Sequence, residues 1–311
     1  MPQGREVRMN LSQEILKQKK EKDVVILAHY YVDGAVQEIA DFVGDSYALA
    51  KKAAETDAKN ILFAGVSFMG ESAKLLNPDK HVYMVDMTAG CAMADMIDAK
   101  EVKRVRTQYP EAAVVCYVNS SAEVKAESDV CVTSSNAVRV TEKLPQKQIY
   151  FIPDSHLAHF VAESMPEKEF IYHDGCCPVH QKIDADSLKK AKEKHKGAKV
   201  LSHPECAEDI LALSDYVGST ADIIRYARED QTKEYIIATE TGVFYQLEKE
   251  NPDKKFYPVT DCQVCPDMKK VTLEKIAQIL EHLEEQKEIV LEEHIMTQAK
   301  LPLEKMLALA E

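Results

Sequence analysis

The chain has 311 residues, of which 45% are hydrophobic and 29% charged, as in an ordinary soluble globular protein with two or three small domains. Its net charge of −13 argues against a general nucleic-acid or acidic-membrane surface, because no broad basic field is available for phosphate groups. No apolar run approaches the length of a membrane span and the first residues lack the apolar stretch of a signal peptide, so a cytoplasmic protein is expected.

The first predicted element is an amphipathic helix at 11–22, and a pattern that occurs three times follows it. Each copy opens with an apolar, strand-like run that ends in polar residues. These runs lie at 24–29, 113–117 and 199–203. A helical stretch follows, then a segment that starts with Asp and ends five residues later with Ser or Thr. The later helices and strands of the copies are predicted at 47–54, 60–65, 82–85, 137–143, 148–152, 170–172, 223–228, 234–239 and 256–259.

The three copies keep a tight register. Their shared aspartates are Asp41, Asp129 and Asp215, which lie 88 and 86 residues apart. Each copy closes on a cysteine, and one series (91, 177 and 265) is spaced by 86 and 88 residues. Three like units around a pseudo-threefold axis would bring one thiolate from each to a common point. The repeat therefore predicts a centrally held metal centre.

Strands that alternate with helices, and that are too continuously apolar for a half-exposed sheet, indicate parallel sheets covered on both faces. The predicted fold class is α/β, with three similar three-layer α/β/α domains whose short parallel sheets are arranged around a pseudo-threefold axis. The expected domains are 1–105, 106–190 and 191–311. The C-terminal helices at 273–283 and 303–310 are expected to pack back on the first domain.

Ligands bind beyond the carboxyl ends of the strands in open α/β sheets, and polar residues recur there at matched positions. Twelve residues before each shared Asp lie His29, Tyr117 and His203, and ten before it lie Tyr31, Asn119 and Glu205. Five residues after it lie Ser46, Ser134 and Thr220, each at an expected helix start. Taken singly, such hydroxyls are most often plain helix caps and such histidines are most often structural. Their recurrence in all three copies favours a site that moves protons and binds anions.

The eight cysteines are expected to be buried, metal-binding or reactive rather than disulfide-bonded. Three of them, Cys116, Cys131 and Cys206, are predicted to be small buried residues. At this point Cys176 competes with Cys177, and Cys262 competes with Cys265. A Cys-x-x-Cys pair alone is equally typical of zinc-binding and redox-active sites.

Nine motifs, in order and over nearly the whole length, resemble those of the quinolinate synthase family, the iron–sulfur enzymes of de novo NAD biosynthesis. They are ILAHYY at 26–31, IADFVGDS at 39–46, AGCAMADM at 89–96, YVNS at 117–120, VTSSNA at 132–137, CPVH at 177–180, HPEC at 203–206, GST at 218–220 and CPDMK at 265–269. The family pattern Trp-x-Gly-x-Cys reads His173-Asp174-Gly175-Cys176-Cys177 here, and the chain has no Trp.

The resemblance implies a [4Fe–4S] cluster held by one cysteine per domain, and the motifs select Cys91, Cys177 and Cys265. Three protein ligands for four irons leave one iron open as a Lewis acid. The implied reaction condenses iminoaspartate with dihydroxyacetone phosphate to quinolinate, phosphate and two waters, with iminoaspartate supplied by an aspartate-oxidising enzyme. The implied acid–base residues are His29, Tyr31, Tyr117, His203 and Glu205, and the implied substrate-binding residues are Ser46, Asn119, Ser134, Ser219 and Thr220.

Two other classes of protein fit part of the pattern. An iron–sulfur or zinc regulatory protein would use the cysteines as sensors, but it would not need matched His, Tyr, Asn and Glu residues beside them. A zinc-dependent hydrolase with three Cys ligands is the third candidate. A brown colour that bleaches in air would favour the iron–sulfur enzyme, whereas a colourless protein that retains zinc would favour the other two.

Overall fold

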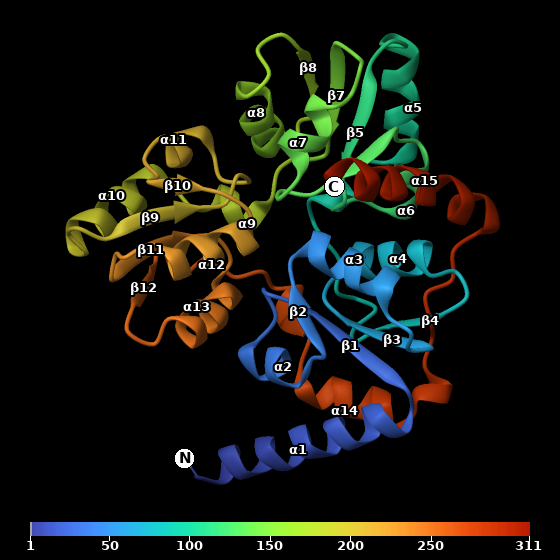
Figure 1. The fold of residues 1–311 in the computed structure, drawn as a ribbon, viewed down its shortest axis with the longest axis vertical. Coiled ribbons are helices and arrows are strands. Elements are labelled where there is room, and N and C mark those ends of the chain that lie inside the picture. The colour runs from blue at the N-terminus through green and yellow to red at the C-terminus, as the bar shows by residue number, and fades with distance from the viewer. Residues whose placement is uncertain (1) are drawn as a thin grey trace. The chain divides into compact units, whose positions relative to one another are not determined.

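The computed structural model describes residues 2–311, with side chains from Asn10 onward. Within this range the chain forms three four-stranded parallel sheets, which confirms the predicted α/β class (Figure 1). Contacts divide the chain into two compact units. The first comprises the chain up to Cys91 together with Pro266–Glu292, and it contains the first sheet. The second comprises Ala92–Cys265 and Glu293–Glu311, and it contains the other two sheets.

All three sheets have one topology, in which the strands follow the spatial order second, first, third, fourth. The first sheet contains β1 (Val24–His29), β2 (Phe42–Gly44), β3 (Asn60–Ala64) and β4 (His81–Met84). The second contains β5 (Ala113–Tyr117), β6 (Val130–Val132), β7 (Gln148–Ile152) and β8 (Glu169–Tyr172). The third contains β9 (Lys199–Ser202), β10 (Tyr216–Val217), β11 (Glu234–Ala238) and β12 (Lys255–Pro258).

The short edge strands β2, β6 and β10 were not predicted as strands, and the shared aspartates hold them in place. The backbone N–H of Asp129 donates to the carbonyl of Val114 at 3.0 Å, and the Val114 N–H donates to the Asp129 carboxylate at 2.7 Å. Asp41 exchanges the same two bonds with Ile26, and Asp215 exchanges them with Val200. Each Asp therefore joins an edge strand to the first strand of its sheet through two hydrogen bonds.

Helices connect the strands, and most of the longer ones begin at a capping side chain. Asp45 caps α3 (Ser46–Glu55), Asp98 caps α5 (Ala99–Gln108), Asp154 caps α8 (Ser155–Glu163) and Asp184 caps α10 (Ala185–Lys194). Each cap accepts a backbone N–H that the first turn of a helix leaves without a partner. The remaining helices within the repeats are α2 (Gly34–Ile39), α4 (Ser67–Leu76), α6 (Ala122–Ala126), α7 (Ala137–Glu142), α9 (Pro178–Gln181), α11 (Glu208–Leu211), α12 (Thr220–Glu229) and α13 (Phe244–Glu250).

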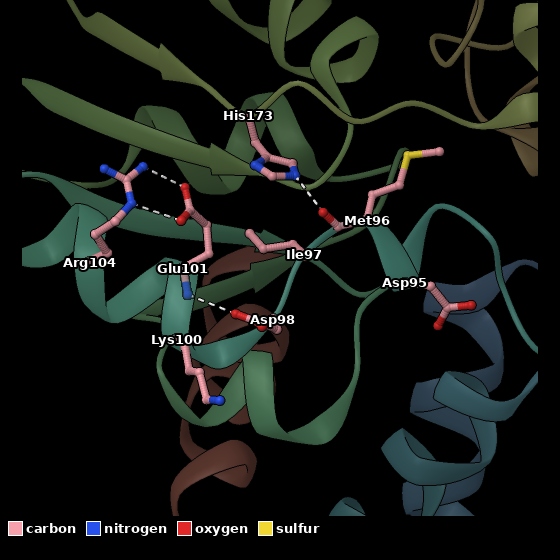
Figure 2. Close-up of a pocket in the computed structure, with 8 residues that line it drawn as sticks. All are labelled: Asp95, Met96, Ile97, Asp98, Lys100, Glu101, Arg104 and His173. Carbon is pink, nitrogen blue, oxygen red and sulfur yellow. Dashed lines mark hydrogen bonds and ion pairs between the residues drawn. The ribbon is translucent and has the colours of Figure 1, made fainter.

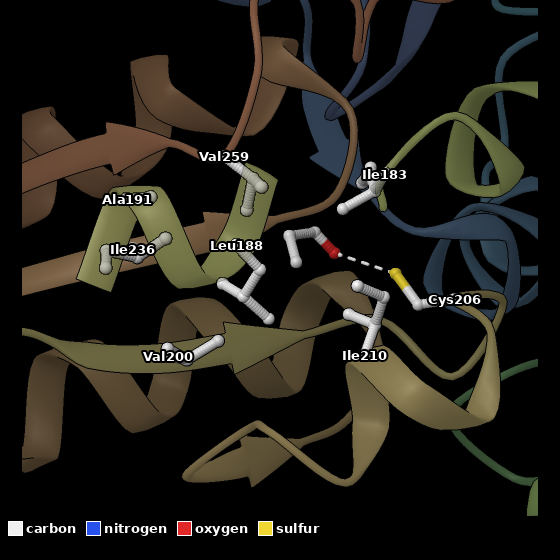
Figure 3. Packing of buried hydrophobic residues seen from close by; sticks show 9 residues of the cluster. Ile183, Leu188, Ala191, Val200, Cys206, Ile210, Ile236 and Val259 are labelled. Atoms are coloured by element: carbon white, nitrogen blue, oxygen red, sulfur yellow. Dashed lines mark hydrogen bonds between the residues drawn. The ribbon is translucent and has the colours of Figure 1, made fainter. Parts of the chain in front are cut away.

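The core of the third repeat shows how helix and sheet pack together. Leu188 of α10, Val200 of β9 and Ile236 of β11 are fully buried in one apolar cluster, which Cys206 joins (Figure 3). The Cys206 thiol donates to the carbonyl of Ala238 at 3.3 Å. Burying each large side chain of this kind contributes about 1.5–3 kcal/mol, so this cluster fixes the third sheet against α10. Cys206 is thus a core residue, as predicted, and so are Cys116 and Cys131.

The terminal helices pack on two different repeats. In the first unit, α14 (Leu273–Glu281) lies against α1 (Pro2–Glu21), as Figure 1 shows. The last helix, α15 (Glu293–Ala310), instead packs on α6, α7 and β6 of the second repeat. Its buried residues include Leu303 and Met306, which need an apolar surface that the edge of the second sheet supplies. This differs from the expectation that both C-terminal helices pack on the first domain. No helix in the described part of the chain is long and apolar enough to cross a membrane.

Candidate active site and metal centre

The polar residues aligned by the repeat do fall at the carboxyl ends of the first strands. His29 ends β1, Tyr117 ends β5 and His203 follows β9 directly. Nδ1 of His29 accepts from the Tyr31 N–H at 3.1 Å, and Nδ1 of His203 accepts from the Glu205 N–H at 3.3 Å. Two matched histidines therefore carry their proton on Nε2 when neutral. This is the edge at which a parallel sheet binds its ligands.

In the second unit, four buried side chains form one connected polar chain. The hydroxyl of Tyr117 donates to Oε1 of Glu205 at 2.6 Å. Oε2 of Glu205 lies 2.8 Å from Nδ1 of His180, and Nε2 of His180 lies 2.9 Å from the hydroxyl of Thr239. All four residues are at most 4% exposed. The structure thus joins Tyr117 and Glu205, both predicted as site residues, to His180 and Thr239, which were not.

Burial determines the ionisation of Glu205 and of the neighbouring His203. Burial lowers the pKa of His203 to about 4, so its ring is neutral near pH 7. Its ring stacks on that of His180 with centroids 5.0 Å apart. Burial alone would raise the pKa of Glu205, but the neighbouring imidazole of His180 and the hydroxyl of Tyr117, which both hydrogen-bond its carboxylate, hold it well below its usual range. Glu205 is therefore an ionised base inside a closed environment.

Asp154 is a second buried acid that the sequence analysis missed. Its Oδ1 accepts from the Leu157 N–H at 2.8 Å, and no described residue bonds its Oδ2. Burial, and then the charge of Glu205, raise the pKa of Asp154 well above its usual range. The backbone groups of Leu157, His156 and Cys177 lower that pKa again, but to a smaller extent. In the sequence, Asp154 lies two residues after β7 and resembles an ordinary helix cap. The sequence therefore does not distinguish it as a site residue.

The same backbone hydrogen bond precedes one cysteine in each repeat. The donor is the first residue of the helical segment after the third strand, which is α4, α8 or, in the third repeat, the 3₁₀ turn Thr241–Val243 before α13. Its N–H donates to a carbonyl in the loop after the fourth strand. The three bonds are Ser67 to Ala89 at 2.8 Å, Ser155 to Gly175 at 2.7 Å and Thr241 to Gln263 at 3.0 Å. The residues two positions past these carbonyls are Cys91, Cys177 and Cys265. Cys176 and Cys262 do not occupy this position.

The cysteines also differ in exposure and surroundings. Cys91, Cys176, Cys177 and Cys265 are partly exposed, Cys262 is exposed, and none of them is in a disulfide, which suits metal binding, whereas Cys116, Cys131 and Cys206 are buried. Cys177 lies beside His180 and Glu205, and one ligand atom from each of these three residues lies within 4.8 Å of the other two. Thiolate, imidazole and carboxylate together form a donor set for a transition metal.

The predicted anion-binding hydroxyls fall near helix starts, with two corrections. Ser46 and Thr220 are the first residues of α3 and α12, but the caps are the preceding Asp45 and Ser219. Ser219 forms a capping box with Asp222, so its hydroxyl already has structural partners. Ser134 lies in a turn three residues before α7 rather than at its start. Ser46 and Thr220 are thus not simple caps.

Asn119 shows the clearest sign of an external ligand among the predicted binding residues. Its Oδ1 is buried, and no described residue donates a hydrogen bond to it. A buried amide oxygen without a donor costs about 1–3 kcal/mol, so such atoms are rare unless a ligand or water satisfies them.

In the first unit the structure brings His29 and Tyr31 together. Their rings meet edge to face with centroids 4.6 Å apart. Nζ of Lys269 donates to the Tyr31 carbonyl at 2.7 Å and lies 3.6 Å from Asp33. A cation from the segment after Cys265 thus fixes the backbone beside Tyr31. The side chains of His29 and Tyr31 are thereby presented at the end of β1.

The second unit also has an open pocket of about 510 Å³ near α5. Figure 2 shows its charged wall, in which Arg104 pairs with Glu101 and His173 lies against the carbonyl of Met96 at 3.1 Å. The ion pair of Arg104 and Glu101 belongs to this wall, and none of the predicted site residues lines the pocket.

Comparison with known proteins gives a consistent result. The family model described as "Quinolinate synthetase A protein" matches residues 13–308. A protein of Clostridioides difficile named quinolinate synthase is 47% identical over 302 residues, covering 97% of this chain and 99% of its own. The Fusobacterium nucleatum protein of that name is 49% identical, covering 96% of this chain and 99% of its own. One of Aquifex aeolicus is 46% identical, covering 96% and 94%.

Proposed function

The chain belongs to the quinolinate synthetase A family and is an enzyme, and we propose that it makes quinolinate for NAD biosynthesis. The proposed reaction condenses iminoaspartate with dihydroxyacetone phosphate and releases phosphate and two waters. The observation that carries this proposal beyond the family name is the buried chain from Tyr117 through Glu205 and His180 to Thr239. Phosphate loss, imine closure with release of one water and a further dehydration need several proton transfers, and such a chain can supply them in one place.

The residues divide into proton carriers and binding groups. Glu205 is placed to take a proton, and the Tyr117 hydroxyl, which it holds at 2.6 Å, is placed to give one. His29, Tyr31 and His203 occupy matched strand ends and complete the acid–base set. Oδ1 of Asn119 is suited to accept a hydrogen bond from substrate. The remaining proposed binding residues are Ser46, Ser134, Ser219 and Thr220.

We propose that a [4Fe–4S] cluster is held by Cys91, Cys177 and Cys265, one from each repeat, and that the repeats are arranged around a pseudo-threefold axis. The repeated hydrogen bond two residues before each of these cysteines supports this choice over Cys176 and Cys262. When bound, such a cluster would supply Lewis acidity at its open iron. We further propose that the domains are 1–105, 106–190 and 191–311. We also propose that the protein is cytoplasmic and that an aspartate-oxidising enzyme supplies its iminoaspartate.

The test is turnover under anaerobic conditions. Cluster-loaded protein is mixed with dihydroxyacetone phosphate and freshly generated iminoaspartate, and quinolinate and phosphate are measured separately. We expect both products in equal amounts, and none from cluster-free protein. Phosphate release without quinolinate, or no turnover by fully loaded protein, would contradict the proposal.

A further inference from the structure

The group formed by Cys177, His180 and Glu205 has the features of a binding site for a single metal ion. Sγ of Cys177, a ring nitrogen of His180 and a carboxylate oxygen of Glu205 all lie within 4.8 Å of one another, and Nδ1 of His180 lies 2.8 Å from Oε2 of Glu205. In a tetrahedral zinc site, the ligand atoms lie roughly 3.3–3.6 Å apart, given bonds of about 2.0–2.3 Å. A small side-chain adjustment would therefore close these three atoms around one ion.

His180 supplies an observation that points to a cation. The residue is 1% exposed, and its Nδ1 faces Oε2 of Glu205 at 2.8 Å. An imidazole nitrogen and a carboxylate oxygen that meet away from water share either a proton or a cation. A metal ion bound by both atoms would take the place of that proton.

The surrounding residues hold both ligands in place. Nε2 of His180 lies 2.9 Å from the Thr239 hydroxyl, and that bond leaves Nδ1 as the lone-pair atom when Nε2 donates. Oε1 of Glu205 is held by the Tyr117 hydroxyl at 2.6 Å, so Oε2 remains for the metal. Second partners of this kind are the usual companions of metal-binding His and carboxylate groups.

We propose that cluster-free protein binds one divalent transition-metal ion, of the zinc or ferrous class, through Cys177, His180 and Glu205. Cys177 binds as the thiolate and releases its proton to solvent, and a water completes the coordination. Because Cys177 is also a proposed cluster ligand, the single ion and the cluster exclude each other. Bound zinc would therefore block cluster loading, while neither Cys91 nor Cys265 would be needed to bind it.

The experiment is a titration of the full-length, reduced, cluster-free protein with Co²⁺ and then Zn²⁺ under anaerobic conditions. We expect one Co²⁺ per chain, a thiolate-to-cobalt absorption band and its loss when Zn²⁺ displaces the ion. Cys177→Ser should abolish the band. His180→Ala should weaken binding at least tenfold, and Thr239→Val, which removes only the supporting hydroxyl, should weaken it about tenfold.

The control variants decide where the ion sits. Cys91→Ser, Cys265→Ser and Cys176→Ser should bind Co²⁺ as the unaltered protein does. If either Cys91→Ser or Cys265→Ser loses the band, the ion occupies the cluster cysteines and the proposal is overturned. Circular dichroism checks that each variant is folded. If His180→Ala does not fold, Thr239→Val still tests the role of His180 in binding.

Cluster loading gives a second readout. Prior addition of one equivalent of Zn²⁺ should slow iron–sulfur reconstitution, and Thr239→Val should need about ten times more Zn²⁺ for the same delay. An equal delay in both proteins would contradict the site. The outcome is separable from the proposed function, since quinolinate formation by protein that binds no Co²⁺ would overturn only this inference.

Discussion

At the scale of single residues, position in the repeat alone does not determine chemistry. Tyr31, Asn119 and Glu205 stand at the same point of three copies, yet Tyr31 contacts a histidine ring and Asn119 keeps an unsatisfied buried oxygen. Glu205 instead bridges Tyr117 and His180. Three copies of one scaffold thus present a phenol, an amide and a carboxylate at equivalent positions. An enzyme with one active site needs different side chains from each copy of an internal repeat, because each copy contributes a different part of that site.

Tyr117→Phe tests the proton chain by removing one hydroxyl. The ring stays in its buried position, so the fold and the iron content should be retained, while kcat should fall by roughly 10²-fold, the usual scale for a lost acid–base group. Quinolinate formation under saturating substrate measures this. Tyr150→Phe is a matched control, because Tyr150 is also buried but lies in the core of the second sheet. Equal activity of the two variants would show that Tyr117 only packs.

Asn119→Ala tests the unsatisfied oxygen. Because Oδ1 has no donor among the described residues, its removal should leave the melting temperature unchanged or higher. If the oxygen binds substrate, KM should rise about tenfold with a smaller change in kcat. Asn136→Ala provides the contrast, since Oδ1 of Asn136 accepts from the Thr133 N–H at 2.7 Å and its loss should lower the melting temperature. A lower melting temperature with an unaltered KM for Asn119→Ala would make Asn119 a structural residue.

Sequence reasoning found the residues that recur and missed those that do not. Glu205 and Tyr117 were found because the repeat aligned them with other polar residues. His180 could have been found from its place three residues after Cys177 in a Cys-Pro-x-His motif. Asp154 and Thr239 could not, since an Asp before a helix and a Thr after a strand are typical of ordinary structure. Only the fold brings Thr239 to His180, 59 residues away.

At the scale of elements, the shared aspartates have a structural role that the repeat alone did not reveal. Strands of two or three residues, such as β10 and β6, give too little periodicity to be predicted. The hydrogen bonds between Asp129 and Val114 set the position of β6 instead, and those between Asp215 and Val200 set that of β10. The longer strands were predicted to within about two residues because their apolar runs are continuous.

Asp129→Ala should therefore destabilise the second sheet. It leaves the Val114 N–H without its acceptor and should cost about 1–2 kcal/mol. Asp129→Asn is the matched variant, because its amide oxygen can still accept that bond and should recover most of the loss. Urea unfolding monitored by circular dichroism gives the comparison. Equal stability of the two variants would show that the carboxylate acts only through its ion pair with Arg106.

The ion pair between Asp86 and Lys275 ties α14 to the loop after β4 and predicts a pH dependence. Partial burial opposes ionisation, but the Lys275 and Thr88 hydrogen bonds lower the pKa of Asp86 to about 2 from the ordinary 3.8. The stabilisation is thus complete above pH 3.8 and is lost as the pH falls through 2. Because Lys275 is 41% exposed, it amounts to at most about 1 kcal/mol.

The measurement is the urea midpoint at pH 6, 4 and 2.5. Asp86→Asn should be less stable than the unaltered chain at pH 6, and the difference should have become smaller at pH 2.5. Lys275→Met, which removes the other partner, should behave in the same way. A stability difference that is independent of pH would show that the carboxylate contributes by packing or by neutral hydrogen bonds rather than by its charge.

At the scale of the whole molecule, the repeat accounts for both the fold and the proposed ligand set. Three sheets of one topology are each followed by a loop with the same hydrogen bond, and a cysteine lies two residues beyond it. The location of α15 did not follow from the repeat, because the helix belongs to no copy. Its apolar residues at helical spacing predict that it packs, but they do not predict on which sheet. Such choices depend on complementary surfaces that appear only after folding.

The three-copy ligand set makes a prediction about the stability of the whole chain. A cluster that binds only the folded state should raise the melting temperature of the chain. Each tenfold increase in the ratio of ligand concentration to dissociation constant adds about 1.4 kcal/mol to the free energy of unfolding. Cys91→Ser, Cys177→Ser and Cys265→Ser should each remove this gain and the bound iron. Cys176→Ser and Cys262→Ser should keep both, since neither residue stands two positions past the repeated hydrogen bond. Anaerobic calorimetry with iron and sulfide analysis compares the five variants. If any one of the first three retains the iron and the stabilisation, one repeat does not contribute a ligand, and the argument from the repeat to the cluster fails.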